Sequence, residues 1–137
     1  MKRITEGSLS EITDGAIQIE RHLGQSGLEN GSRVLIIQSR SGILRVIPLV
    51  SDIVAQVRIS LDLESFTIAS RNVYDKIKNS QMRLLHSTGF CPLEDSCIWE
   101  GYFNLPQKNK IEEFVEWLRK MEVVREVHID YLDTNMD

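Results

Sequence analysis

The spacing of apolar residues constrains the fold of this chain more than any other feature. Residues 54–61 alternate apolar and polar side chains, which predicts a half-buried strand. Apolar residues then recur at helical spacing in Phe66, Ala69, Val73 and Ile77. The period therefore changes from two to between three and four, as it does where a strand leads into a helix.

The same change occurs a second time further along the chain. Residues 82–88 and 96–103 favour strands, with residues 89–95 as the loop between them. A helical stripe follows, made of Ile111, Phe114, Val115, Leu118 and Met121, and residues 123–132 favour a last strand. This order predicts an α+β fold, the ferredoxin-like βαββαβ sandwich, with an antiparallel four-stranded sheet and two helices on one face.

The first third of the chain carries different patterns. Ser8 and Glu11 have the spacing of a helix-capping box, and Ile12, Ala16, Ile19 and Leu23 continue at helical spacing. Residues 33–38 and 43–48 favour two strands joined by a turn that contains glycine. We therefore expect a short helix and a β-hairpin as an appendage over residues 1–50, followed by the ferredoxin-like domain over residues 51–137.

Composition argues against two classes of partner. The 137 residues carry 16 Lys and Arg against 20 Asp and Glu, a net charge of −4, and no basic stripe is present. We therefore expect no nucleic-acid partner, because such partners require clustered positive charge. No stretch approaches the roughly 20 apolar residues that cross a bilayer, and the first residues do not have the pattern of a signal peptide. We expect a soluble, cytoplasmic protein with no membrane partner.

Several segments after residue 54 resemble the ACT-like superfamily of small-molecule regulatory domains, and most nearly the ligand domain of nickel-responsive transcription regulators. The matching segments are the strand Leu84-Leu85-His86-Ser87-Thr88, the loop ending Asp95-Ser96-Cys97, the strand 98–103 and the step Glu122-Val123-Val124-Arg125-Glu126-Val127. The resemblance implies a regulatory domain that binds an amino-acid-like metabolite or a metal between subunits. The nickel regulators carry histidines before the cysteine, whereas residues 89–94 contain none, and only Cys97 matches a metal-ligand position.

The resemblance also implies where a ligand binds. In ACT-like domains the turn before the first helix commonly faces the effector, and here that turn contains Asp62, Glu64 and Ser65. The two carboxylates suit a ligand that carries an amino group. With Gly89 and Asp95 of the later loop, these residues form the predicted ligand site. The other interpretation of residues 62–65 is simple capping of the helix that follows.

Two interpretations of the cysteines stay open. Cys91 and Cys97 have the spacing C-x5-C and form either a soft-metal or redox pair, with His86 nearby, or a buried Cys97 packed as a small hydrophobe beside an incidental Cys91. Zinc favours about four ligands, more than these residues supply. Two cysteines also fall short of a disulfide framework. We expect neither a resident metal nor a cofactor.

Strand 96–103 is apolar on both faces, which predicts that both faces are covered. Either self-association, as a homodimer or tetramer, or packing by the N-terminal segment would cover the second face. The aromatic residues of the last third form either a core or a ligand wall or interface: Trp99, Tyr102, Phe103, Phe114 and Trp117. The hairpin that carries Arg33, Arg40 and Arg45 either docks a partner or pairs with the hairpin of a second chain, or it has a solvated edge whose charges block aggregation.

No catalytic constellation is evident, because no acid, base and nucleophile can be assembled from these patterns. We therefore expect a non-enzymatic protein. The leading hypothesis is a regulatory or sensor protein that binds a small amino-acid-like metabolite or a metal at a subunit interface. The alternative is an oligomeric protein-interaction or assembly module without a ligand.

Overall fold

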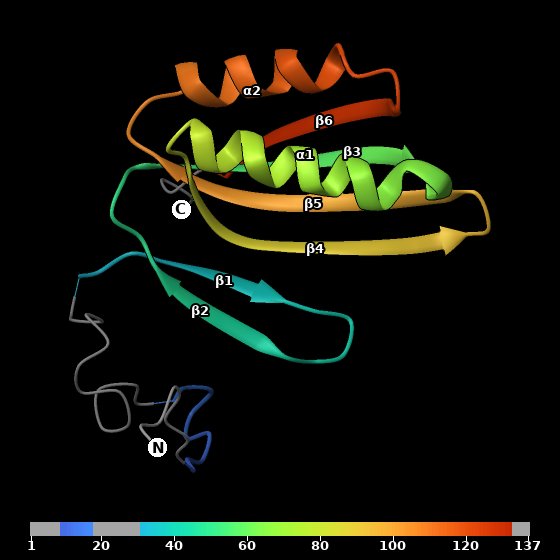
Figure 1. Ribbon diagram of the computed structural model, residues 1–137. Helices are drawn as coiled ribbons and strands as arrows, with labels where there is room; N and C mark the ends of the chain where they lie inside the picture. Colours follow the sequence, from blue (N-terminus) through green and yellow to red (C-terminus); the bar gives the residue numbers. More distant parts are fainter. Residues whose placement is uncertain (1–8, 18–30, 133–137) are drawn as a thin grey trace, which may run out of the picture. The chain divides into compact units, whose positions relative to one another are not determined.

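The computed structural model describes residues 9–17 and 31–132. Within this part of the chain the structure is α+β, with two α-helices and two antiparallel sheets (Figure 1). The chain divides into two compact units, residues 1–49 and residues 50–137. Each unit is described by itself.

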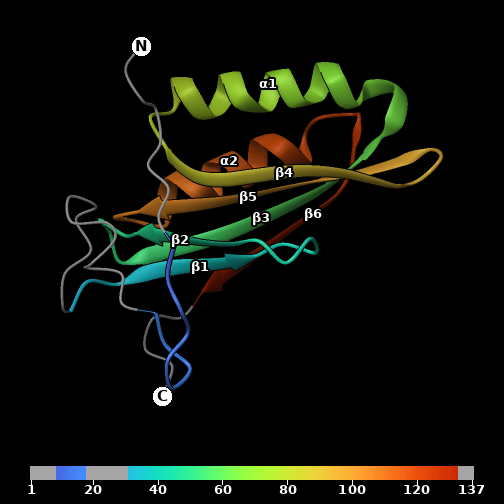
Figure 2. The same cartoon turned by 90° about the horizontal axis from the view of Figure 1, so that it is seen from below.

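The second unit contains a four-stranded sheet with helices on one face. Its strands lie in the order β4-β5-β3-β6, and each is antiparallel to its neighbours. Figures 1 and 2 show both helices over the same face of this sheet. The elements follow the chain as β3 (Ile53–Asp62), the 3₁₀ turn η2 (Leu63–Ser65), α1 (Phe66–Asn79), β4 (Arg83–Leu93), β5 (Ser96–Leu105), α2 (Asn109–Arg119) and β6 (Val124–Leu132).

The core of this unit lies between the sheet and its two helices. Strand β3 turns every second side chain toward the helices, and these side chains are at most 1% exposed: Ala55, Val57, Ile59 and Leu61. The helices bury the apolar stripes predicted from their spacing. These are Ala69, Val73 and Ile77 on α1 and Ile111, Phe114, Val115 and Leu118 on α2. The two periods of the sequence therefore identify the residues that hold the layers together.

The segment that enters β3 is fixed by one buried amide. Asn104, 2% exposed on β5, accepts hydrogen bonds from the backbone N–H groups of Val50 (2.9 Å) and Ser51 (3.1 Å) through Oδ1. Its Nδ2 donates to the carbonyls of Ser51 (2.8 Å) and Ile53 (3.0 Å). Burial of the polar side chain is tolerated because both ends of the amide are satisfied.

The first unit contains the predicted hairpin. Strands β1 (Val34–Gln38) and β2 (Leu44–Pro48) pair antiparallel with Ile36 opposite Val46. The turn between them is closed by hydrogen bonds from Ser39 N–H to the carbonyl of Ile43 and from Gly42 N–H to the carbonyl of Ser39, both 3.0 Å long.

The predicted N-terminal helix is wrong over the residues that the structure describes. Residues 9–17 are not helical, and Thr13 and Ala16 instead exchange two backbone hydrogen bonds of 3.0 Å. Between them Asp14 and Gly15 have φ angles of 52° and 75°. An Asp-Gly pair is well suited to such a turn, and this local preference prevails over the capping pattern. The rest of the predicted helix, residues 18–23, lies outside the described residues.

The predicted loop over residues 89–95 is also shorter in the structure. Strand β4 continues to Leu93, and β5 begins at Ser96. Pro92 is tolerated in β4 because this strand is at the edge of the sheet and its register shifts between Phe90 and Leu93. Gly89 therefore lies within a strand, opposite Trp99, and not in a loop.

Candidate functional site

The two segments predicted to bind a ligand meet at one end of the four-stranded sheet. The backbone N–H of Leu63 donates a hydrogen bond of 3.2 Å to the carbonyl of Asp95. Asp62 and Ser96 are also register partners at the ends of β3 and β5. We call residues 62–66 together with residues 89–97 the corner. The topology thus brings together residues about thirty positions apart in the chain, because β3 and β5 are neighbours.

The predicted ligand residues differ in whether their side chains are exposed to a ligand or already engaged with other residues of the protein. Glu64 and Asp95 are exposed, and Ser65 is half-buried. Asp62 forms an ion pair with Arg125 of β6, so its carboxylate already has a cationic partner. Gly89 lies against Phe66, since a β-carbon at position 89 would fall 2.7 Å from Cζ of that ring. The corner therefore presents mainly the carboxylates of Glu64 and Asp95.

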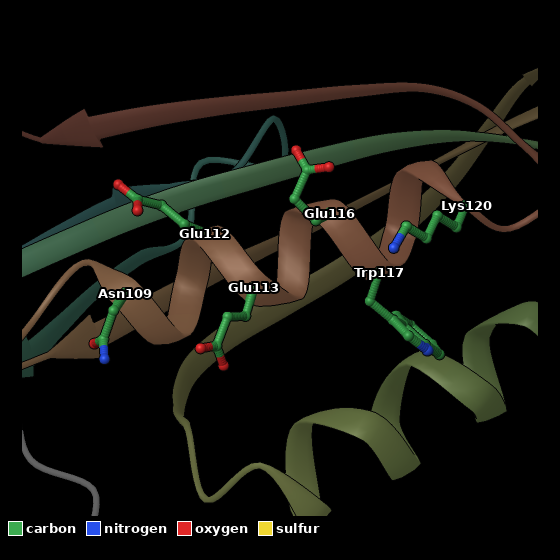
Figure 3. A pocket seen from close by; sticks show the side chains of 6 residues that line it. All are labelled: Asn109, Glu112, Glu113, Glu116, Trp117 and Lys120. Carbon is green, nitrogen blue, oxygen red and sulfur yellow. The ribbon is translucent and has the colours of Figure 1, made fainter.

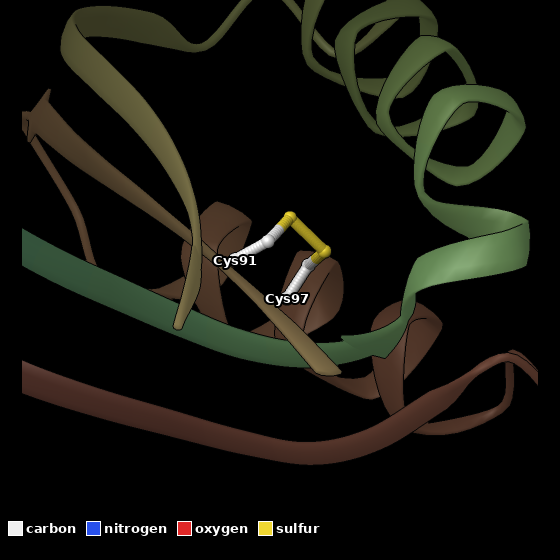
Figure 4. The surroundings of a disulfide bond; sticks show 2 residues. All are labelled: Cys91 and Cys97. Carbon is white, nitrogen blue, oxygen red and sulfur yellow. A yellow bond between two sulfur atoms is a disulfide. The ribbon is translucent and has the colours of Figure 1, made fainter. Parts of the chain in front are cut away.

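The two cysteines form a disulfide at the corner (Figure 4). The sequence left open a soft-metal or redox pair on one side and a buried Cys97 beside an incidental Cys91 on the other, and it did not predict a disulfide outright. Cys91 and Cys97 lie near the facing ends of the antiparallel strands β4 and β5, with their Cα atoms 4.0 Å apart. Cys97 is fully buried and Cys91 is exposed. Disulfide sulfurs are not thiolates, the form of cysteine that binds metals.

His86 does not complete a metal site with the cysteines. It lies five residues before Cys91 on β4 and pairs in register with Tyr102, and the two rings have centroids 6.3 Å apart. Among residues 9–17 and 31–132, no group of three or more His, Cys, Asp or Glu side chains could hold a metal ion. Of the three weak metal candidates of the sequence, the structure thus joins Cys91 and Cys97 in a disulfide, and His86 forms no group of three metal-binding side chains with them.

The aromatic residues divide between the core and the surface. Trp99, Phe103 and Phe114 are at most 2% exposed and belong to the core. Trp117 is half-buried and stacks on Phe114 with ring centroids 6.0 Å apart. Strand alternation places Tyr102 on the sheet face away from the helices, where its hydroxyl accepts a 2.9 Å hydrogen bond from Nε2 of Gln56. These residues do not form one continuous aromatic wall.

Burial and the nearby Glu100 carboxylate raise the pKa of Tyr102 above its ordinary value. The hydrogen bond from Gln56 and the positive charge of Arg58 act in the opposite direction and offset part of this effect. A desolvated phenol next to a carboxylate resists ionisation because the phenolate would gain a like charge at short range. Tyr102 is therefore held in its neutral form well into the alkaline range.

A surface hollow along α2 was not predicted from the sequence (Figure 3). It has a volume of about 460 Å³ and is lined by Asn109, Glu112, Glu113, Glu116, Trp117 and Lys120. Glu116 is paired with Arg119 at 2.9 Å, and Nζ of Lys76 lies 5.5 Å from the centre of the Trp117 ring. In the sequence these residues are typical of a solvated helix face, which gives no signal of a hollow. None of the predicted ligand residues lines it.

Comparison with known proteins supports a small α+β fold and identifies no family. No protein-family model matches the chain, and no curated protein is similar to it in sequence. Among solved structures, the chain is similar to the solution structure of the C-terminal domain of the MgtC protein from Mycobacterium tuberculosis. The TM-score is 0.54 and the identity 15%, over 64% of this chain and 95% of that one. At this identity the likeness shows a shared small α+β fold.

Neither α1 nor α2 is long and apolar enough to cross a membrane.

Proposed function

We propose that residues 50–137 form a non-enzymatic regulatory domain of the ACT-like kind, which binds a small amino-acid-like metabolite at the corner. The strand order β4-β5-β3-β6 supports a ferredoxin-like topology, because the first and third strands of the unit are central and the second and fourth are at the edges. The likeness to the MgtC C-terminal domain supports the choice of a small α+β domain.

The observation that carries the proposal is the hydrogen bond from Leu63 N–H to the Asp95 carbonyl. It joins the turn before α1 to the β4–β5 turn, and these are the two segments that the sequence predicts to bind the effector. A ligand held there would contact two elements that are separate in the chain. Such a ligand would couple the start of α1 to the end of the β4–β5 hairpin, and a regulatory domain needs a coupling of this kind.

The charge of the corner favours a ligand with an amino group. Glu64 and Asp95 are exposed carboxylates, whereas Arg125 is engaged with Asp62. An ammonium group between these carboxylates would gain charge-assisted hydrogen bonds. A metal is the less favoured ligand, because no group of three or more metal-binding side chains gathers within the described residues.

Self-association is part of the proposal. Strand β4 is an edge strand, and Phe90 of the corner and its register partner Ile98 have exposed fractions of 51% and 36%. Edge strands and exposed apolar side chains are surfaces on which a second subunit gains burial. In a homodimer formed along β4, the corner of each subunit would lie close to the shared interface. Ligand binding would then favour one subunit arrangement over another.

Thermal shift measurements test the ligand proposal. We expect at least one free amino acid, in a panel that also contains nucleotides and divalent metals, to raise the melting temperature of the protein. Glu64→Gln should weaken that shift, whereas Glu113→Gln, an equally conservative change on α2, should leave it unchanged. If no compound in the panel shifts the melting temperature, or if both variants respond alike, the corner is not the ligand site.

The hairpin supports a second candidate function, an assembly module that needs no ligand. One of its faces carries apolar side chains that are well exposed, with Ile36 at 62%, Leu44 at 60% and Val46 at 38%. Both functions predict an oligomer, so light scattering distinguishes them by whether a change in the β1–β2 hairpin weakens that oligomer. An assembly module predicts an oligomer that Ile36→Ser weakens and that Ile68→Ser, a matched change at an exposed position on α1, does not. A monomer at micromolar concentration would contradict both the module and the proposed homodimer.

A further inference from the structure

The Cys91–Cys97 disulfide is unequally accessible from its two sides. Cys97 has an exposed fraction of 0%, and in register it faces Leu61, which is also fully buried. Cys91, on the edge strand, is exposed. An external thiolate can therefore approach the disulfide from the side of Cys91. Accessibility of the attacked sulfur is one of the factors that set the direction and rate of thiol–disulfide exchange.

The disulfide also closes a short covalent ring, and one residue of that ring accepts a backbone hydrogen bond from the turn after β3. The ring runs from Cys91 to Cys97 and contains Asp95, whose carbonyl accepts the hydrogen bond from Leu63. Within the ring the regular register of β4 and β5 is interrupted between Phe90 and Leu93. Because ladder hydrogen bonding is irregular here, the covalent bond contributes more to holding this end of the hairpin than it would in a regular ladder.

We propose that the Cys91–Cys97 pair is a thiol–disulfide switch that controls the order of the corner. In the opening direction, the thiolate of a low-molecular-weight thiol attacks Sγ of Cys91, the S–S bond breaks, and Cys97 leaves as a thiolate that takes up a proton. A second thiol then attacks the reagent sulfur of the mixed disulfide and releases Cys91. The protein disulfide is reduced by two electrons, and two thiols are oxidised to one disulfide.

Opening the disulfide frees residues 92–96 from their covalent closure. The Asp95 carbonyl then has no fixed position relative to β3, and the hydrogen bond from Leu63 weakens. The 3₁₀ turn η2, which begins at Leu63, then loses its hydrogen bond to the β4–β5 turn. The pairing of β3 with β6 does not involve the disulfide ring. The switch therefore acts locally on the corner and leaves the pairing of β3 with β6 in place.

The compartment sets the resting state of the switch. The sequence predicts a cytoplasmic protein, and cytosolic thiols are kept reduced. In that setting the switch rests open and closes by exchange with an oxidised low-molecular-weight disulfide, in the reverse of the steps above. This inference concerns the order of the corner and does not require that a metabolite binds there.

Single-cysteine variants test the direction of exchange. The folded Cys97→Ala variant, which keeps the exposed Cys91, should gain the mass of one glutathione when incubated with oxidised glutathione. The folded Cys91→Ala variant, which keeps the buried Cys97, should stay unmodified under the same conditions. Equal modification of both variants, or modification of Cys97 alone, would overturn the proposed attack at Cys91.

Hydrogen exchange of the wild-type chain tests the consequence and does not depend on how the variants fold. We expect the amide of Leu63 and those of residues 94–96 to exchange faster in the reduced protein than in the oxidised one, while amides of β3 that pair with β6 are unchanged. The Cys91→Ala, Cys97→Ala double variant should be insensitive to reductant. Equal exchange in the two redox states, or a wild-type protein that forms no disulfide with oxidised glutathione, would refute the switch.

Discussion

The indole ring of Trp99 lies against Gly101, two residues further along β5. A β-carbon at position 101 would fall 2.9 Å from Cζ3 of that ring, closer than real β-carbons approach other atoms. Trp99 is 2% exposed, and Gly101 is also buried, so the ring has little room to move aside. The glycine is therefore required by packing, and its backbone flexibility is not the reason for it.

This relationship predicts that Gly101→Ala destabilises the domain. The added methyl group displaces the indole, and overpacking of this kind costs about 1–3 kcal/mol of the free energy of unfolding. Urea denaturation followed by tryptophan fluorescence measures the change. An unchanged denaturation midpoint would mean that the ring does not lie over position 101.

A second prediction concerns the polar end of the same indole. Nε1 of Trp99 donates a 3.2 Å hydrogen bond to the hydroxyl of Tyr74, which also lies 2.7 Å from Oγ of Ser87. Tyr74→Phe leaves the indole N–H without this acceptor, and an unsatisfied buried donor costs about 1–3 kcal/mol. Ser87→Ala is the matched control, because it removes a partner of the hydroxyl and leaves the indole bonded. The free energy of unfolding should fall more in Tyr74→Phe, and the reverse order would contradict this account.

A third prediction concerns the amide that fixes the entry into β3. Asn104→Ala leaves the N–H groups of Val50 and Ser51 without their acceptor, so we expect a loss of at least about 2 kcal/mol in the free energy of unfolding. The amides of Val50 and Ser51 should also exchange faster with solvent. Asn104→Asp keeps an acceptor for both N–H groups and should protect them better than alanine does. Equal exchange rates in the two variants would show that Oδ1 of Asn104 is not their acceptor.

The fourth prediction concerns alkaline pH. Burial and Glu100 raise the pKa of Tyr102 in the folded protein, so the folded state holds this proton more tightly than the unfolded chain does. The resulting stability is fully present below the usual tyrosine pKa of about 10 and is lost as the pH rises through the raised value. Denaturation should therefore become easier above about pH 10 in the wild type, and less so in Tyr102→Phe. If the two proteins lose stability in parallel, Tyr102 does not titrate as stated.

The second unit could be predicted from the sequence because its pattern is regular. Residues such as Val57 on β3, Val73 on α1 and Leu118 on α2 are buried at the positions that the two periods require. Each of these elements is long enough for its period to be recognised, and each buries one face. The meeting of residues 62–65 with Asp95 also follows from strand order, since it needs only that β3 and β5 are neighbours.

Other features depend on choices that spacing does not show. At Asp14 and Gly15 the preference for a tight turn prevails over a helical stripe, and both patterns were present in the same residues. The disulfide depends on where β4 ends, and β4 continues to Leu93, beyond the end at residue 88 that the sequence predicts. The hollow along α2 depends on how the side chains that line it, Trp117 among them, are arranged in space, which sequence spacing does not record.

We propose above that a small amino-containing metabolite binds at the corner. Backbone amide chemical shifts of the labelled protein, recorded as the amino acid that gives the largest thermal shift is added, test it most directly. Binding at the corner predicts saturable shift changes that concentrate at residues 62–66 and 89–97. Saturable changes that concentrate instead along α2 near Trp117, or the absence of any saturable change across the panel, would contradict it.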